Sequence, residues 1–107
     1  MPATTVLVLT TLPADADALA FGRVLIDEHL AACVSVLGSL HSVYRWKDAV
    51  EDAREQQLLI KTEASVVEAL ERRLATLHPY DVPEFLVLAV SGGSEAYLKW
   101  VRQSIAG

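Results

Sequence analysis

Two long stretches of β-prone residues, separated by only three residues, constrain the fold of this chain more than any other feature. Cys33–Trp46 and Val50–Thr62 are rich in β-branched and aromatic side chains, and Lys47-Asp48-Ala49 joins them. Asp tolerates a left-handed backbone, so Asp48 can form the turn of a β-hairpin without glycine. At about 3.3 Å per residue the first strand would span roughly 45 Å, whereas a globule of about 100 residues has a radius of gyration near 13 Å. The hairpin is therefore predicted to project beyond the core of its own chain.

The outer half of this hairpin is predicted to contact a second copy of the chain. It carries Val43, Tyr44, Trp46 and Val50, and aromatic side chains on an open strand edge promote aggregation. Pairing with a neighbouring subunit would bury these four residues, which we assign to an oligomer interface. The alternative is that Gly38 bends the hairpin back over its own sheet.

The remaining segments are predicted to add two strands and three helices. Thr5–Leu9 and Glu84–Val90 are apolar runs typical of buried strands, and a helical pattern with one apolar stripe covers residues 15–30. A second helix over residues 65–77 is expected to start with a capping box at Ser65 and Glu68, and a last helix is expected to be capped by Ser94. The order β-α-β-β-α-β plus a terminal helix is that of the ferredoxin-like fold, an α/β (α+β) sandwich.

Right-handed crossovers would place both long helices on one face of a four-stranded sheet. The other face would lack helices, apart from the short terminal one, and would need burial by a partner. Gly22 lies in the first helix, where glycine lowers stability, so we expect it to mark a close approach to the sheet.

Composition limits the partners and the setting of the protein. The 107 residues suit a single domain spanning residues 1–107, and 52% of them are apolar. A net charge of −5 with scattered basic residues argues against nucleic acid as a partner. The apolar runs fall far short of the roughly 20 residues that a membrane helix needs. A single cysteine and the absence of a basic leader after Met1 favour a cytoplasmic location.

Five short motifs resemble the CutA-type divalent-cation tolerance proteins from about Thr5 to Arg102. They are Leu30-Ala31-Ala32-Cys33-Val34, Ser42-Val43-Tyr44-Arg45-Trp46, Leu58-Leu59-Ile60-Lys61-Thr62, His78-Pro79-Tyr80-Asp81-Val82-Pro83-Glu84 and Tyr97-Leu98-Lys99-Trp100. The resemblance implies a ferredoxin-like homotrimer similar in architecture to the PII signalling proteins. It also implies a role in tolerance of copper and other divalent metals, with no established enzymatic activity. The alternative is a PII-like signalling or scaffold trimer that binds a metabolite or a protein in the inter-subunit cleft.

Two positions depart from the copper ligands proposed for bacterial members of that family. Those relatives have cysteine where this chain has Thr10, and a second histidine where it has Leu77. His78 is the one member of that proposed set that this chain keeps.

His78, Cys33 and Glu84 are the candidate metal ligands. His78 lies in a proline-rigid connector near Glu84, and imidazole, carboxylate and thiolate together suit copper or zinc. The alternative for His78 is capping of the preceding helix, where an imidazolium is favourable. The alternative for Cys33 is a small core residue in an apolar strand.

A cleft for a small ligand is expected between subunits. Its candidate residues are Tyr44, Arg45, Trp46, Lys61 and Tyr80, with Arg45 clamping an anion; interface packing is the alternative for the aromatic pair. No motif of a hydrolase is present and no spacing favours Cys33 with a histidine as a nucleophile–base pair, so we expect no enzymatic activity.

Overall fold

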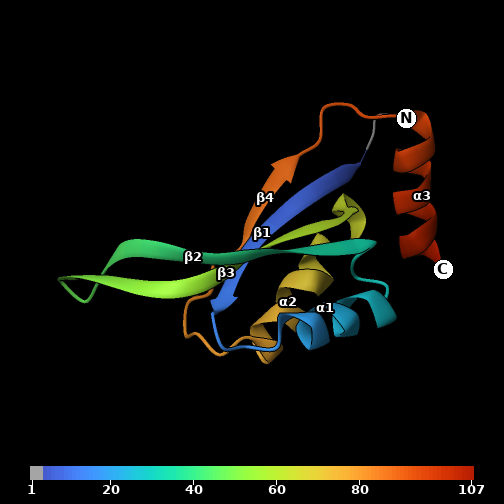
Figure 1. Cartoon of the computed structure of the whole chain (residues 1–107). Helices are drawn as coiled ribbons and strands as arrows, with labels where there is room; N and C mark the ends of the chain where they lie inside the picture. Colours follow the sequence, from blue (N-terminus) through green and yellow to red (C-terminus); the bar gives the residue numbers. More distant parts are fainter. Residues whose placement is uncertain (1–3) are drawn as a thin grey trace.

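A computed structural model describes residues 4–107 and contains the four predicted strands and three α-helices (Figure 1). In chain order the elements are β1 (Thr5–Pro13), α1 (Ala18–Asp27), β2 (Cys33–Trp46), β3 (Ala49–Glu63), a short 3-10 helix (Ala64–Val66), α2 (Val67–Leu77), β4 (Leu86–Ala89) and α3 (Glu95–Ala106). The strands form one sheet in the order β2-β3-β1-β4, and every neighbouring pair is antiparallel. This is the ferredoxin-like arrangement that the sequence predicted.

The core lies between one face of the sheet and the pair α1 and α2, which lie side by side beneath it (Figure 1). Val8 of β1 and Leu58 of β3 are fully buried on that face, and Leu25, Leu70 and Leu74 pack onto them from the helices. Burial of each such side chain contributes roughly 1.5–3 kcal/mol. The predicted placement of both long helices on one face is confirmed.

Gly22 marks the expected close approach between α1 and the sheet. A Cβ atom at this position would lie 3.3 Å from both Cβ and Cγ1 of Val34. The glycine therefore lets the helix axis approach β2 more closely than alanine would.

The β2–β3 hairpin projects well beyond the rest of the molecule (Figure 1). With the hairpin included, the chain measures 46 × 26 × 24 Å along its principal axes. Lys47 and Asp48 form its two-residue turn with φ values of 50° and 66°, so both occupy the left-handed region that a type I′ turn requires. The alternative of a fold-back at Gly38 is wrong. The pairing instead shifts register between Leu37 and Ser39, a β-bulge, and β2 continues outward.

The apolar strand near the C-terminus is shorter and more exposed than predicted. β4 covers only Leu86–Ala89, and Leu86 and Leu88 are 54% and 44% exposed. It is an edge strand that pairs with β1 alone, and neither α1 nor α2 covers the face that these leucines share with Leu7 and Leu9. An apolar run indicates that a strand is buried, but it does not distinguish burial by the same chain from burial by a second chain.

The helix starts were predicted with mixed success. Ser94 Oγ accepts a 3.2 Å hydrogen bond from the Tyr97 N–H and caps α3 as expected. The capping box at Ser65 is wrong, because a 3-10 turn precedes α2 and no side chain caps its first residue, Val67. α3 stands at the end of the sheet opposite the hairpin tip (Figure 1), with Val101 fully buried. Within residues 4–107, no helix has the length and apolar character required to cross a bilayer.

Candidate functional site

A cleft of about 680 Å³ lies between the outer part of the hairpin and the connector from α2 to β4. We call residues 40–55 the arm and residues 78–84 the loop. Ser42, Tyr44, Trp46, Glu51 and Glu55 line the cleft from the arm, and residues 79–84 line it from the loop. Thr11 of β1 and Gln57 of β3 complete the lining.

His78 fixes the start of the loop. It ends α2, where its N–H donates to the Leu74 carbonyl, and its side chain is 8% exposed. Its Nε2 lies 2.6 Å from the Thr11 carbonyl oxygen, and its Nδ1 accepts a 3.1 Å hydrogen bond from the Tyr80 N–H. Both ring nitrogens therefore have protein partners, so the imidazole orients the loop and offers no lone pair to a ligand.

Tyr80 joins the loop to the arm. Its hydroxyl donates a 2.7 Å hydrogen bond to Oε2 of Glu55, a carboxylate that is only 6% exposed. Burial, followed by this hydrogen bond, raises the pKa of Tyr80 well above its usual value of 10. The phenol is therefore a stable donor to Glu55 at physiological pH.

A second hydrogen bond ties the end of the loop to the sheet. Gln57 Nε2 donates to Oε2 of Glu84 at 3.0 Å and to the Thr10 carbonyl at 2.8 Å. Glu84 thus lines the cleft with one of its two carboxylate oxygens already oriented by the protein.

The charged residues among residues 4–107 that line the cleft are all acidic. The lining contains the carboxylates of Glu51, Glu55, Asp81 and Glu84, and no Lys, Arg or His. Clustered charges of one sign in a concave surface focus the electrostatic field and concentrate counter-ions. The cleft therefore has the chemistry of a cation site.

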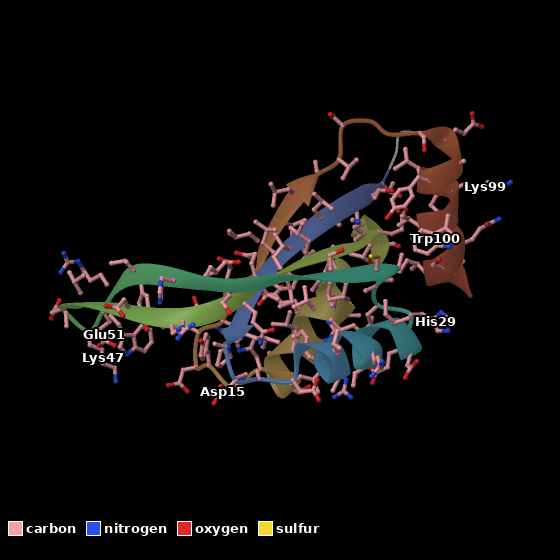
Figure 2. The ribbon with its side chains drawn as sticks, viewed as in Figure 1. Asp15, His29, Lys47, Glu51, Lys99 and Trp100 are labelled. Atoms are coloured by element: carbon pink, nitrogen blue, oxygen red, sulfur yellow. The ribbon has the colours of Figure 1, made fainter. Side chains whose placement is uncertain are left out.

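The aromatic residues add a second feature that favours cations. Tyr44, Trp46 and Tyr80 line the same cleft, and Lys47 Nζ lies 5.8 Å from the centroid of the Trp46 ring, within cation–π range. Figure 2 shows Lys47 and Glu51 near the outer end of the arm, far from Lys99 and Trp100 on α3.

The three predicted metal ligands do not come together in one chain. Cys33 pairs with Lys61, four residues along β3 from Gln57, which corresponds to about 13 Å from the cleft end of the sheet. Both nitrogens of His78 are engaged, and Glu84 alone of the three lines the cleft. Among residues 4–107, no three His, Cys, Asp or Glu side chains are grouped closely enough to hold a metal ion. Within one chain, Cys33, His78 and Glu84 are therefore not placed to share a metal ion.

The single chain gathers some of the residues that we predict for an inter-subunit ligand cleft. Tyr44, Trp46 and Tyr80 line the cleft, but Arg45 and Lys61 do not. Arg45 lies between Tyr44 and Trp46 on β2 and pairs with Val50. Because successive side chains of a strand point to opposite faces, Arg45 projects from the other face of the arm. Lys61 lies near α3, with its Nζ 5.7 Å from the centroid of the Tyr97 ring. The lining that residues 4–107 of one chain give this cleft therefore contains no cationic residue, and an anion clamp at Arg45 between subunits stays a prediction.

Sequence reasoning missed the acidic residues of the arm. Glu51 and Glu55 were interpreted with Asp52 as a solvated surface, yet the first two line the cleft and Asp52 pairs with Val43 on the opposite face. The available signal was spacing: Glu51 and Glu55 are an even number of residues apart, which places them on one face of a strand.

Comparison with known proteins assigns the chain to a family. Residues 6–104 match the family model described as CutA1 divalent ion tolerance protein. The chain belongs to the CutA1 divalent ion tolerance family. This CutA1-family chain is similar to the divalent-cation tolerance protein CutA of Pectobacterium atrosepticum, at 44% identity over 94% of this chain and 91% of that protein.

Structural and eukaryotic relatives support the same assignment. The crystal structure of CutA from Xylella fastidiosa is similar with a TM-score of 0.91 and 44% identity, covering 95% of this chain and 98% of that one. A CutA homologue of Danio rerio is 35% identical over 92% of this chain. This CutA1-family chain spans 66% of that relative's length, so the fish protein has additional sequence.

Proposed function

We propose that this CutA1-family protein contributes to divalent-cation tolerance as a binding protein rather than an enzyme, and that the acidic cleft is where it binds cations. One observation carries the proposal: among residues 4–107, the cleft lining contains four carboxylates and no basic residue. Carboxylate oxygens suit hydrated divalent ions, which keep several waters and use only one or two protein carboxylates.

Copper is the ion implied by the sequence resemblance, and it prefers imidazole and thiolate ligands. The cleft offers copper carboxylate oxygens and hydroxyl groups instead, so we expect weaker selection for copper over other divalent ions than a His–Cys site would give. The role in tolerance would then rest on reversible binding of several divalent ions.

Calorimetric titration with Cu²⁺, Zn²⁺ and Mn²⁺ tests the proposal. Wild type should bind with an affinity that falls about tenfold in Glu84→Gln, because one charge-assisted contact is lost. Glu95→Gln on α3 removes an equal charge outside the cleft lining and should bind as wild type does. Equal binding by Glu84→Gln and wild type would remove the cleft from the account.

We further propose that the protein acts in the cytoplasm as a homotrimer. Two surfaces of the single chain call for a partner. One is the patch that the leucines of β4 form with Leu7 and Leu9 on the sheet face without α1 and α2, and the other is the arm face opposite the cleft, where Val43 and Val50 are 72% and 67% exposed. Several exposed apolar side chains on neighbouring strands are typical of an interface. Light scattering coupled to gel filtration should give three times the chain mass, whereas a folded monomer at micromolar concentration would contradict the trimer.

A PII-like scaffold is the second candidate function, and the arm favours it. Val43, Arg45 and Val50 project from the arm face opposite the cleft, so a protein could bind there without entering the cleft. Arg45→Glu, which changes a residue of this face that we do not assign to the trimer interface, should lose protein partners in a pull-down while keeping the trimer and its cation binding. Retention of every partner would count against the scaffold.

A further inference from the structure

The cleft is larger than a site for a bare metal ion and its carboxylates are further apart. Its volume is about 680 Å³. Glu51 and Glu55 lie four residues apart on one strand face, a separation of about 13 Å. No group of three metal-ligating side chains exists among residues 4–107. A ligand that neutralises these charges must be extended and must carry its positive charges apart from one another.

Glu55 is a nearly buried carboxylate with an unused acceptor. Its Oε2 accepts from Tyr80, whereas Oε1 accepts no hydrogen bond from residues 4–107, and no Lys or Arg in that range forms an ion pair with it. The Oε1 atom keeps access to solvent, because Thr10 Oγ1 is the only buried side-chain polar atom among residues 4–107 without a hydrogen-bond partner. A donor that enters the cleft could therefore pair with Oε1 while the rest of the Glu55 side chain stays buried. The donor must be able to leave water and hydrogen-bond directly.

The aromatic walls favour an organic cation over a hydrated metal ion. Tyr44 and Trp46 line the arm side and Tyr80 lines the loop side, so methylene groups would be buried against apolar ring faces. The Trp46 ring already holds one ammonium group, that of Lys47, at 5.8 Å from its centroid. Alkylammonium groups combine the charge that the carboxylates require with the apolar surface that the rings favour.

We propose that the cleft binds a linear aliphatic polyamine, with ammonium groups at the Glu55–Tyr80 and Glu51–Trp46 positions and a third near Glu84. This inference deepens the proposed function, because it uses the same cleft and assigns an organic class of cation to it. Lys47 does not line the cleft, but its ammonium group beside the Trp46 ring competes for the outer position. Divalent ions would then share the cleft with polyamines as weaker competitors.

The test is titration of the assembled protein with spermidine, followed by calorimetry and by Trp46 fluorescence in a Trp100→Phe background. Glu84→Gln and Trp46→Leu should each weaken binding about tenfold or more. Lys47→Gln should tighten it several-fold, since it removes the competing ammonium. An uncharged diol of similar length should not bind.

Matched variants separate this site from general attraction to an acidic protein. Glu95→Gln and Lys99→Gln change the net charge by the same amounts on α3, remote from the arm (Figure 2), and should leave spermidine affinity unchanged. Equal effects of Lys47→Gln and Lys99→Gln, or no binding of spermidine by wild type, would overturn the proposal. Divalent-ion binding at Glu84 without spermidine binding would overturn this inference alone, whereas spermidine binding without divalent-ion binding would overturn only the proposed metal function.

Discussion

The Tyr80 hydroxyl donates a 2.7 Å hydrogen bond to Oε2 of Glu55, and this bond joins the loop after α2 to the arm of the β2–β3 hairpin. The two residues come from elements that are 25 positions apart in sequence. Both residues line the acidic cleft, and their contact gives a nearly buried carboxylate its donor.

Removal of this donor should destabilise the protein. Tyr80→Phe leaves Glu55 buried without its hydrogen bond, so the free energy of unfolding should fall by about 1–3 kcal/mol. Urea denaturation measures the change. Tyr97→Phe is the matched control: Tyr97 is 42% exposed, its hydroxyl makes no hydrogen bond within residues 4–107, and the change should stay within about 0.5 kcal/mol. Equal effects of the two variants would show that the Tyr80–Glu55 bond is unimportant.

The same contact predicts a loss of stability at alkaline pH. The pKa of Tyr80 is raised in the folded protein by burial and by Glu55, so between the ordinary value of 10 and the raised value the folded state binds more protons than the unfolded state. The stabilisation is complete below pH 10 and is lost as pH rises above it. Denaturation midpoints measured from pH 8 upward should therefore decline less in Tyr80→Phe than in wild type, and parallel curves would contradict the assignment.

Two buried threonines should respond in opposite directions to the same substitution. Thr10 Oγ1 is buried without a hydrogen-bond partner among residues 4–107, so Thr10→Val should stabilise the protein by about 1 kcal/mol. Thr62 is equally buried, but its hydroxyl donates at 2.8 Å to the Leu30 carbonyl, so Thr62→Val should cost about 1 kcal/mol. Thermal unfolding compares the two variants. A water held at Thr10 would instead make its substitution destabilising.

Gly22→Ala should destabilise the protein when residue 34 is valine, but not when it is alanine. The added Cβ would meet Val34 at 3.3 Å, and overpacking costs about 1–3 kcal/mol, which exceeds the gain of about 1 kcal/mol in helix propensity. In a Val34→Ala background the contact disappears and Gly22→Ala should become neutral or stabilising. Additive effects in this double-mutant cycle would mean that the two residues are not coupled.

The element order and the projecting hairpin could be predicted because both follow from local periodicity and length. Val6, Val8 and Leu12 alternate along β1, and the run from Cys33 to Trp46 is too long for one small core. The exposure of β4 could not be predicted, because apolar character is the same whether a strand is buried by its own helices or by another subunit.

Which side chains of β2 line the cleft depends on a β-bulge that the sequence alone does not predict. Cys33, Ser35 and Leu37 face the side of the sheet without α1 and α2, and a regular strand would continue that face with Val43 and Arg45. The bulge between Leu37 and Ser39 shifts the register by one residue and brings Tyr44 and Trp46 to this face instead. Gly38 was the signal for an irregularity, but its consequence required the pairing with β3.

The most direct test of the cation cleft is an NMR titration of the protein with Zn²⁺ and, separately, with spermidine. The account predicts shifts of the Trp46 indole N–H and of backbone amides in residues 42–57 and 79–84, saturating together, with α3 unchanged. Saturable shifts centred on Lys99 and Trp100 of α3, or on Cys33, would contradict the account, as would the absence of any saturable shift.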